Sequence, residues 1–400
     1  MPWPIYLHLV LAVPFLFLYW YVGTKLTNAL VHGFQFLRRR VKKILFIIAA
    51  WLFCVPLLLL ASYFIDRSWA VGVALGEIRV IDFLFIYPYW YGLVCTAQLG
   101  IAFLLTDLLK MFLFWLYRHS KERWLHLQGR IIIAFTVPMI CYVLVKIISD
   151  TSSVRISIKE YTVPELPKSL DGFRIVHVSD IQVDDRTGGK IFDDAIQKVQ
   201  VLQPDLTIFT GDLVTAGTKY IQQGARIIGK MNAKYGIYAC LGNHDAWADA
   251  EQVTKHLREN GVIVLEDSVS RIHAGMSNIK LFGINNFYGR RAAHSIFSKQ
   301  GTDSTDLQIL ITHSAVQWLV DSASQHRYNL FLSGHTHGGQ IVLGLPWWPI
   351  IMSKIETPYV KGFYTVGSML VSVTNGIGLT GAPFRFQAPA EISIIIIRCR

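Results

Sequence analysis

Charged side chains are scarce in this 400-residue chain, at 16% of residues, whereas soluble domains carry roughly 25%. The shortage is uneven. Residues 1–150 hold 14 basic and 6 acidic residues, and residues 151–400 hold 24 and 21. The net charge of +11 therefore comes mainly from the first part, where we interpret it as membrane topology. The near balance of the second part argues against a groove that binds nucleic acid.

Cysteines are also few. The five cysteines show no CxxC or other paired spacing, which excludes a disulfide framework and a thiolate metal site. No basic residue precedes the first apolar run and no small-residue cleavage site follows it, so we expect this run to be retained rather than removed as a signal peptide.

Long apolar runs are present only in the first part, which predicts an all-α transmembrane region. Four runs approach or exceed the roughly 20 residues needed to cross a bilayer: 4–23, 44–65, 83–105 and 131–148. We therefore predict a transmembrane helical anchor at 1–150 and a second domain at 151–400. Polar residues inside these runs are few, which favours an anchor over a transporter with a regulatory domain.

Lysine and arginine predict the orientation of this anchor. The segments 24–43 and 106–130 hold six and five basic residues, and the segment 66–82 holds two. The positive-inside rule then places the two basic segments in the cytoplasm and the second domain on the non-cytoplasmic side. A further span hidden around 69–87 would reverse this orientation.

The second part alternates short apolar runs with helix-like stretches, which predicts a layered α/β architecture. The stretch 342–366, which contains Trp347 and Trp348, is predicted as a loop or rim. The predicted helices are 193–203, 219–233, 248–260 and 314–322; the predicted strands are 154–158, 174–178, 206–210, 237–241, 262–265, 279–282, 308–312, 329–333, 369–374 and 391–397.

Polar residues follow five of the apolar runs, which predicts a metal site along one edge of a sheet. These residues are Asp180 and Gln182, Asp212, Asn243 with His244 and Asp245, His313, and His335 with His337. Oxygen and imidazole ligands without thiolate suit Mn, Fe, Zn or Co. Asp212 is the candidate bridge between two divalent cations, which would generate a bridging hydroxide as the nucleophile. His244 could protonate the leaving oxygen, and Asp245 could orient His244.

These ordered motifs resemble the calcineurin-like metallophosphoesterase family. Its signature is Asp-x-His, Gly-Asp, Gly-Asn-His-Asp/Glu, a lone histidine and Gly-His-x-His. The matching pieces here begin at Asp180, Gly211, Gly242, His313 and Gly334. The resemblance implies a four-layer α/β/β/α sandwich. It assigns Asp180, Asp212 and His337 to the first metal, and Asp212, Asn243, His313 and His335 to the second. The later Asn375 to Gly378, Pro383 and Arg385 look like the membrane-associated or exported subgroup.

One position departs from the family pattern, because Gln182 stands where the family has histidine. Three outcomes remain open: the first metal binds more weakly, Gln182 ligates through its carbonyl oxygen, or a neighbour such as Asp184 or His177 substitutes. We expect retained activity with an altered metal preference. His177, inside a strand, is more typical of a core residue, and Asp184 of a solvated loop.

These observations favour a membrane-anchored, metal-dependent phosphohydrolase that cleaves a phosphoester or pyrophosphate, with a lipid-linked or envelope substrate suggested by the anchor. The alternative is a catalytically weak or inactive binding or regulatory module, for which Gln182 would be the sign of lost activity. Arg290, Arg291 and Arg385 are candidate phosphate-binding residues, against the plainer interpretation of solvated surface arginines.

Overall fold

The computed structural model describes residues 3–112, 121–285, 297 and 306–399. The chain groups into two compact units. The helical unit contains Met1–Ile148, Leu343–Ile350 and Gly381–Pro383, and the α/β unit contains Ser149–Val342, Ile351–Thr380 and Phe384–Arg400. The predicted domain boundary at residue 150 stays a prediction. Two short segments from late in the chain group with the helices.

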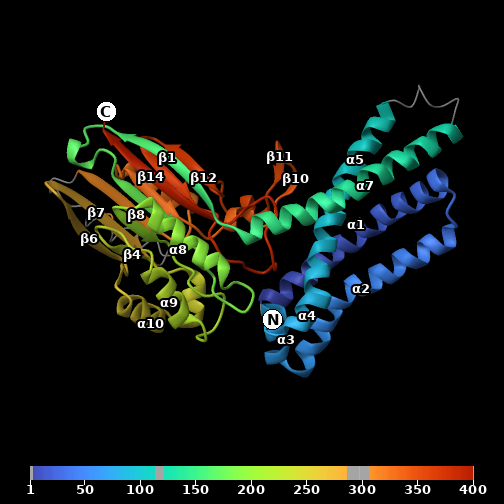
Figure 1. Cartoon of the computed structure of the whole chain (residues 1–400), viewed down its shortest axis with the longest axis horizontal. Coiled ribbons are helices and arrows are strands. Elements are labelled where there is room, and N and C mark those ends of the chain that lie inside the picture. Colours follow the sequence, from blue (N-terminus) through green and yellow to red (C-terminus); the bar gives the residue numbers. More distant parts are fainter. Residues whose placement is uncertain (1–2, 113–120, 286–296, 298–305, 400) are drawn as a thin grey trace. The chain divides into compact units, whose positions relative to one another are not determined.

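Four helical stretches of the first unit are long and apolar enough to cross a membrane, as predicted: Ile5–Phe34, Arg38–Ile65, Arg79–Phe112 and Glu122–Ser152. Helices suit this environment because every backbone polar group between their ends is satisfied within the helix. The segment around 69–87 contributes no separate span among the described residues. The helices are α1 (Trp3–Phe34), α2 (Arg38–Ile65), α3 (Arg67–Leu75), α4 (Arg79–Ile81), the π-helix η1 (Asp82–Ile86), α5 (Tyr87–Phe112) and α7 (Lys121–Ser152) (Figure 1).

Small residues and one charge pair hold α1 against its neighbours. Gly33 of α1 and Gly129 of α7 approach so closely that a Cβ on either would collide with the backbone of the other helix, which is the contact that small residues permit between spans. Lys25 of α1 forms an ion pair with Asp107 of α5, and the Tyr21 hydroxyl donates to the same carboxylate at 2.8 Å. The unit also includes a two-stranded hairpin, β10 (Leu343–Leu345) and β11 (Trp348–Ile350).

The α/β unit is built on two six-stranded sheets. In the first sheet β2 to β5 run parallel, and the late strand β14 lies between β1 and β2. Figure 1 shows β14 beside β1. In spatial order its strands are β1 (Arg155–Val163), β14 (Glu391–Cys399), β2 (Arg174–Val178), β3 (Leu206–Phe209), β4 (Ile237–Ala239) and β5 (Val262–Val264).

The second sheet has a parallel centre with antiparallel edges. Strands β13, β9, β8 and β7 are parallel, and β12 and β6 pair antiparallel at the two ends. In spatial order the strands are β12 (Gly362–Val366), β13 (Met369–Val373), β9 (Leu330–Ser333), β8 (Leu307–Thr312), β7 (Ser277–Ile284) and β6 (Ser268–Ala274).

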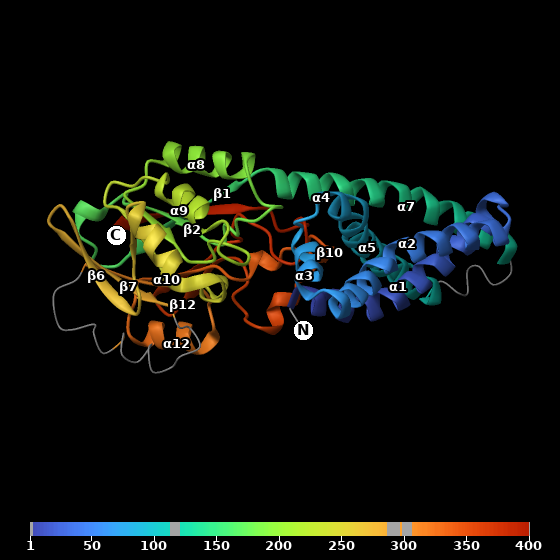
Figure 2. The same cartoon turned by 90° about the horizontal axis from the view of Figure 1, so that it is seen from below.

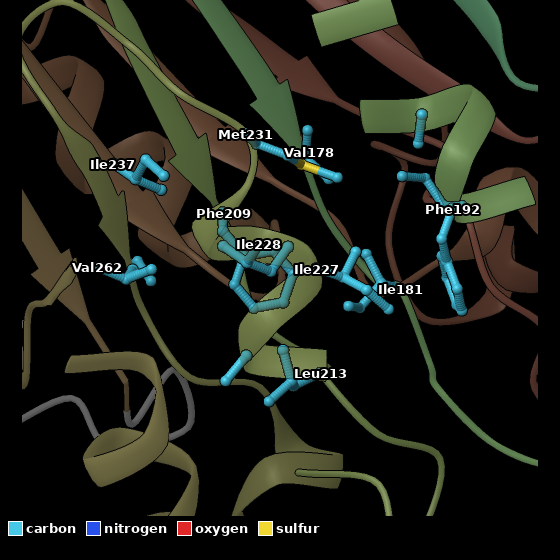
Figure 3. Packing of buried hydrophobic residues seen from close by; sticks show 14 of the residues in the cluster. Val178, Ile181, Phe192, Phe209, Leu213, Ile227, Ile228, Met231, Ile237 and Val262 are labelled. Atoms are coloured by element: carbon cyan, nitrogen blue, oxygen red, sulfur yellow. The ribbon is translucent and has the colours of Figure 1, made fainter. Parts of the chain in front are cut away.

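Three buried clusters show the predicted α/β/β/α layering. Side chains of β3 and β8 such as Ile208 and Ile309 pack between the sheets. Phe209 packs on the opposite face of β3 with Ile228 of the helical layer (Figure 3). That layer contains α8 (Lys190–Leu202), α9 (Ile221–Gly229) and α10 (Asn243–Glu259), and α12 (Gln317–Gln325) covers the second sheet through Leu319 (Figure 2). Because both faces of each sheet are buried, the central strands are continuous apolar runs.

The structure differs from the predicted local structure in three places. The stretch 342–366 is not all loop: it contains β10, β11, the short η4 (Met352–Ile355) and β12. The edge strand β6 was not predicted, because its burial is partial and its sequence mixes polar with apolar residues. In addition, α10 begins at Asn243 rather than near 248, with a break in helical geometry at Asp249 that separates its first turns from the predicted part.

Candidate metal centre

The residues predicted to bind metal follow the carboxyl ends of parallel strands in both sheets. Asp180 comes two residues after β2, Asp212 three residues after β3, and Asn243 opens α10 after β4. In the second sheet His313 follows β8 directly, and His335 comes two residues after β9. His337 opens the short helix η3 (His337–Gly339). Parallel strands end at the same edge of a sheet, so each sheet presents its residues together.

Contacts across the two sheets join these residues into one cluster. The backbone N–H of His335 donates to both oxygens of Asp180, at 3.2 and 3.0 Å. His337 Nε2 lies 3.4 Å from Asp180 Oδ1. One potential ligand atom from each of Asp180, Asp212 and His313 lies within 4.8 Å of the other two, and all three residues are buried. The structure therefore brings the predicted ligands together from the edges of two sheets, rather than along one edge of a single sheet as predicted.

Asp212 lies at the centre of this cluster. Its Oδ2 is 3.2 Å from His313 Nε2 and accepts a hydrogen bond from Gln182 Nε2 at 2.8 Å. Its Oδ1 accepts from the backbone N–H of His244 at 2.9 Å, and His244 Nε2 is 4.0 Å from Oδ2. A Cβ on Gly242 would collide with Oδ1, so the close approach of the α10 N-terminus requires glycine there.

Burial and charge act in opposite directions on this cluster. Burial alone would raise the pKa of Asp212, but the His313 and His244 rings hold that pKa below its usual range. Burial alone would lower the pKa of His313, but Asp212 raises it to about 10. Asp212 and His313 therefore form a buried ion pair in the metal-free protein. Burial raises the pKa of Asp180, because the nearby histidines offset the effect of burial less for Asp180 than they do for Asp212.

The backbone at the cluster is unusual. A positive φ in the left-handed region is uncommon for residues with a side chain and is strained by about 1–3 kcal/mol. Twelve described non-glycine residues have positive φ. Five of them are predicted metal ligands: Asp180 (50°), Gln182 (44°), Asp212 (60°), His335 (73°) and His337 (50°).

Hydrogen bonds assign the ring tautomers of three histidines. Nδ1 of His313 donates to Thr210 O at 2.7 Å, and Nδ1 of His244 donates to Thr215 O at 2.6 Å. Both rings therefore carry the lone pair of their neutral form on Nε2. His335 Nε2 instead lies 2.8 Å from Glu356 Oε1, which assigns its lone pair to Nδ1. Such bonds fix the orientation of metal-binding histidines.

Two buried oxygens support a cation at this place. Within the described part of the chain, Gln182 Oε1 and Asn243 Oδ1 accept no hydrogen bond although both atoms are buried. Buried polar atoms are usually paired, and a hard or borderline cation would satisfy both. Asn243 lies between Gly242 and His244, which both contact Asp212. The donor set of carboxylate, amide and imidazole is of the kind that suits Mn, Fe, Zn or Co, and the identity of the metal stays a prediction.

Comparison with known proteins agrees with this geometry. The family model for calcineurin-like phosphoesterase matches residues 173–339. An uncharacterized metallophosphoesterase of Bacillus subtilis, YkuE, is 31% identical over 247 residues, covering 58% of this chain and 82% of YkuE. The chain belongs to the calcineurin-like phosphoesterase family.

Two relatives described as transmembrane proteins with a metallophosphoesterase domain are also similar to this chain. A Danio rerio protein described as a transmembrane protein with metallophosphoesterase domain is 29% identical over 253 residues. The match covers 60% of this chain and 56% of that protein, so the chain spans little more than half of this relative.

The crystal structure of the calcineurin-like phosphoesterase YfkN from Bacillus subtilis aligns with 51% of this chain at 15% identity and a TM-score of 0.34.

A buried arginine distinguishes His337 from the other histidines of the cluster. Arg385 is fully buried and donates to the carbonyl oxygens of His337, Ala388, Asn375 and Gly378 at 2.6–3.2 Å. Its Nη2 also lies 3.4 Å from His337 Nδ1. A guanidinium only donates, so Nδ1 of His337 is the acceptor of this contact in the metal-free protein. Arg385 is thus neither a solvated surface residue nor exposed to a substrate phosphate.

Asp245 occupies a different place from the one expected beside His244. Its carboxylate accepts the backbone N–H groups of Asp212, Leu213 and Gly242 at 2.8–2.9 Å. It thereby ties the Asp212 turn to the first turn of α10. Burial, aided by Asp212 and opposed by these N–H groups, raises the pKa of Asp245 to about 7. Its predicted role in orienting His244 stays a prediction.

The other candidates around the centre divide into three groups. His177 is a core residue between Thr210 and Ser372. Asp184 accepts from Thr215 and from two backbone N–H groups of its own turn. Arg290 and Arg291 lie outside the described residues. Glu356, which bonds His335, was not predicted, since a single acid in an irregular segment carries no sequence signal.

Proposed function

We propose that this chain is a membrane-anchored phosphohydrolase that uses two divalent metal ions to cleave a phosphoester or pyrophosphate bond. The observation that carries the proposal is the convergence of predicted ligands from both sheets, five of them in strained left-handed conformation. Strain of this kind persists where function requires a fixed geometry. The four apolar helices support a substrate that is itself membrane-bound, for which a lipid-linked phosphoester is the candidate.

We propose two ligand sets, as the resemblance to the family implies. Asp212, Asn243, His313 and His335 would hold one cation, and hydrogen bonds already fix the two imidazoles of this set. Asp180, Gln182, Asp212 and His337 would hold the other, with Asp212 common to both. Gln182 would ligate through Oε1, because its Nε2 donates to Asp212. When bound, the cations polarise a phosphoryl oxygen and lower the pKa of a water molecule.

His244 is the proposed proton donor. With Nδ1 donating to Thr215 O, the protonated ring carries its second proton on Nε2 and can give it to the leaving oxygen. Asp212 Oδ2 lies 4.0 Å from this Nε2. Trp247 packs against the ring with centroids 4.8 Å apart and limits its motion.

The test measures hydrolysis of an aryl phosphodiester by the purified full chain with added Mn. Replacing His244 by alanine should lower kcat by about 10²–10⁴-fold, the usual contribution of a general acid. Asp212→Ala should lower kcat by at least the same factor and should also lose bound metal. His273→Ala, which alters an exposed histidine on β6, is the matched control and should retain full activity.

The competing hypothesis is an inactive binding module, and the Gln182 substitution is the observation that favours it. Wild-type protein that binds two metals and still fails to cleave a broad panel of phosphoesters would support that hypothesis and overturn ours. Equal rates for wild type and Asp212→Ala would do the same, because a contaminant would then be the source of the activity.

We further propose that the α/β unit lies on the non-cytoplasmic side. The basic residues of the segments around α1–α2 and α5–α7 support this orientation through the positive-inside rule. A C-terminal fusion to a reporter active only outside the cytoplasm should be active. Activity of a cytoplasm-specific reporter at the same position would reverse the orientation.

A further inference from the structure

An apolar pocket of about 270 Å³ lies within the helical unit. Its walls are α5, α7 and the first strand of the β10–β11 hairpin; Ala102, Ile132 and Leu345 each contribute from one of these elements. Both helices are candidate membrane spans. Of the polar side chains at the pocket, Thr106 donates to Phe103 O within its own helix at 2.7 Å. The pocket therefore offers an occupant mainly hydrocarbon.

The second polar side chain, Gln98, fixes the wall of the pocket. It lies inside a candidate span and is only 5% exposed. Its Nε2 donates to Gly344 O at 3.1 Å, and the Gly344 N–H donates to its Oε1 at 2.8 Å. Polar groups in a span are costly unless paired, and they mark functional positions. This two-way bond holds the hairpin backbone against α5 and makes the pocket a built feature rather than a chance gap between helices.

The hairpin is formed so that only glycine fits at the bonded position. Gly344 has a φ of +84°, and a Cβ there would lie 2.6 Å from Trp348 O. The following tip exposes Trp347 and Trp348, at 79% and 73%. Exposed tryptophans are typical of the membrane–water interface. A hydrocarbon chain that enters the pocket would therefore belong to a molecule whose polar end lies at the membrane–water interface.

The volume of the pocket is near the lower end of the range of roughly 300–1,000 Å³ found for ligand sites. It suits part of one hydrocarbon chain rather than a whole lipid.

We infer that this pocket binds a hydrocarbon chain of a membrane lipid, and that this lipid carries the phosphoester cleaved at the metal centre. The second half rests on the proposed function, whereas the first half stands on the pocket and the Gln98–Gly344 bond. The substrate class is accordingly an acyl- or polyisoprenyl-type phospholipid, with the chain held by α5, α7 and β10.

Binding is tested with the full chain in phosphatidylcholine vesicles that contain phosphatidic acid with a photoreactive diazirine at the end of one acyl chain. Cross-linked peptides are mapped by mass spectrometry. Ala102→Trp fills the pocket, and Ala50→Trp places the same side chain on an exposed position of α2. In the wild type and in Ala50→Trp, the photoreactive lipid should label the pocket residues of α5 and α7. Ala102→Trp should lose about tenfold or more of this label, since two lost methylene contacts are worth that much.

Equal labelling of the pocket in all three proteins, or labelling spread evenly over the outer helix faces, would overturn the binding site. Ala102→Leu, a smaller substitution, keeps the test available if Ala102→Trp does not fold, and should show an intermediate loss. Folding of each variant is checked by its circular-dichroism spectrum and its elution in gel filtration.

The substrate half is tested by comparing that soluble ester with a panel of vesicle phospholipids and polyisoprenyl phosphates. Ala102→Trp should retain cleavage of the soluble ester and lose cleavage of the lipid about tenfold. Lipid cleavage that is the same in both variants would overturn the lipid assignment. Wild type that cleaves neither substrate would refute the proposed function instead, and the cross-linking result would then decide the pocket alone.

Discussion

At the scale of single residues, the two proposed ligand sets differ in how firmly hydrogen bonds orient their members for metal binding. His313 and His335 have their second ring nitrogen held by Thr210 O and Glu356, which is the arrangement that supports metal binding. The other set contains neutral Gln182 and His337, whose Nδ1 faces Arg385 at 3.4 Å. A guanidinium beside a ligand also opposes the charge of a cation. We therefore expect the site that contains Gln182 and His337 to bind metal more weakly than the site that contains His313 and His335.

Replacing Gln182 by histidine tests this difference. Imidazole is a stronger ligand than an amide oxygen for these metals, so the affinity of the weaker site should rise. We expect a gain of about tenfold or more, comparable to the roughly 10–100-fold effects of changes around metal ligands. The measurements are metal content of the purified protein and calorimetric titration with Mn.

The control for this substitution is Gln222→His on the exposed face of α9, which should bind metal as the wild type does. Unchanged stoichiometry and affinity in Gln182→His would show that position 182 does not contribute to the metal site.

At the scale of elements, the central strands β2 and β13 are joined by a buried histidine. His177 Nε2 lies 3.0 Å from Thr210 Oγ1, and its Nδ1 lies 3.3 Å from Ser372 Oγ in the other sheet. Burial lowers the pKa of His177 to about 3, whereas an unfolded histidine titrates near 6.5. The neutral ring therefore contributes stability that is fully present above pH 6.5 and is lost as the pH falls toward 3.

The substitution His177→Gln should weaken this pH dependence, because an amide can bond both hydroxyls without titrating. Wild type should lose about 1.4 kcal/mol per pH unit from this residue below pH 6.5, and the variant should lose less. Thermal midpoints between pH 7.5 and 4.5, recorded with a chelator present so that metal release does not contribute, provide the measurement. Parallel curves for the variant and wild type would contradict the assignment.

The elements also show which parts of the fold the sequence predicts. Strands such as β3 and β8 are buried on both faces, so their apolar runs and the polar residues that end them were recognisable. Edge strands β6 and β12 are partly exposed, and the β10–β11 hairpin mixes glycine, proline and tryptophan, so neither carried a clear pattern. The roles of Arg385 and Glu356 depend on backbone carbonyls and on a distant histidine, which no local pattern contains.

At the scale of the whole molecule, metal binding should contribute to the stability of the α/β unit, because the ligands come from both sheets. Free Mn at a hundredfold excess over its Kd should stabilise the unit by about 2.7 kcal/mol. For a unit of this size that corresponds to a rise in Tm of roughly 5–10 °C. Differential scanning fluorimetry of chelator-treated protein, with and without Mn, measures it.

Asp212→Asn should lose most of this rise, since the shared carboxylate is removed. Glu160→Gln, which alters an exposed carboxylate paired with Arg398, should keep it. The same rise in Asp212→Asn and Glu160→Gln would mean that Mn stabilises the protein through some other site.

The left-handed backbone at five predicted ligands has a consequence for how this protein tolerates mutation. At each of these positions glycine would relieve the conformational strain, so stability alone would select against the present residues. The metal-free fold is thus less stable than a ligand-free redesign of the same backbone would be. A screen for thermostable variants of the chelated protein should enrich substitutions at these positions, and the stabilised variants should have lost their metal, a trade of activity for stability.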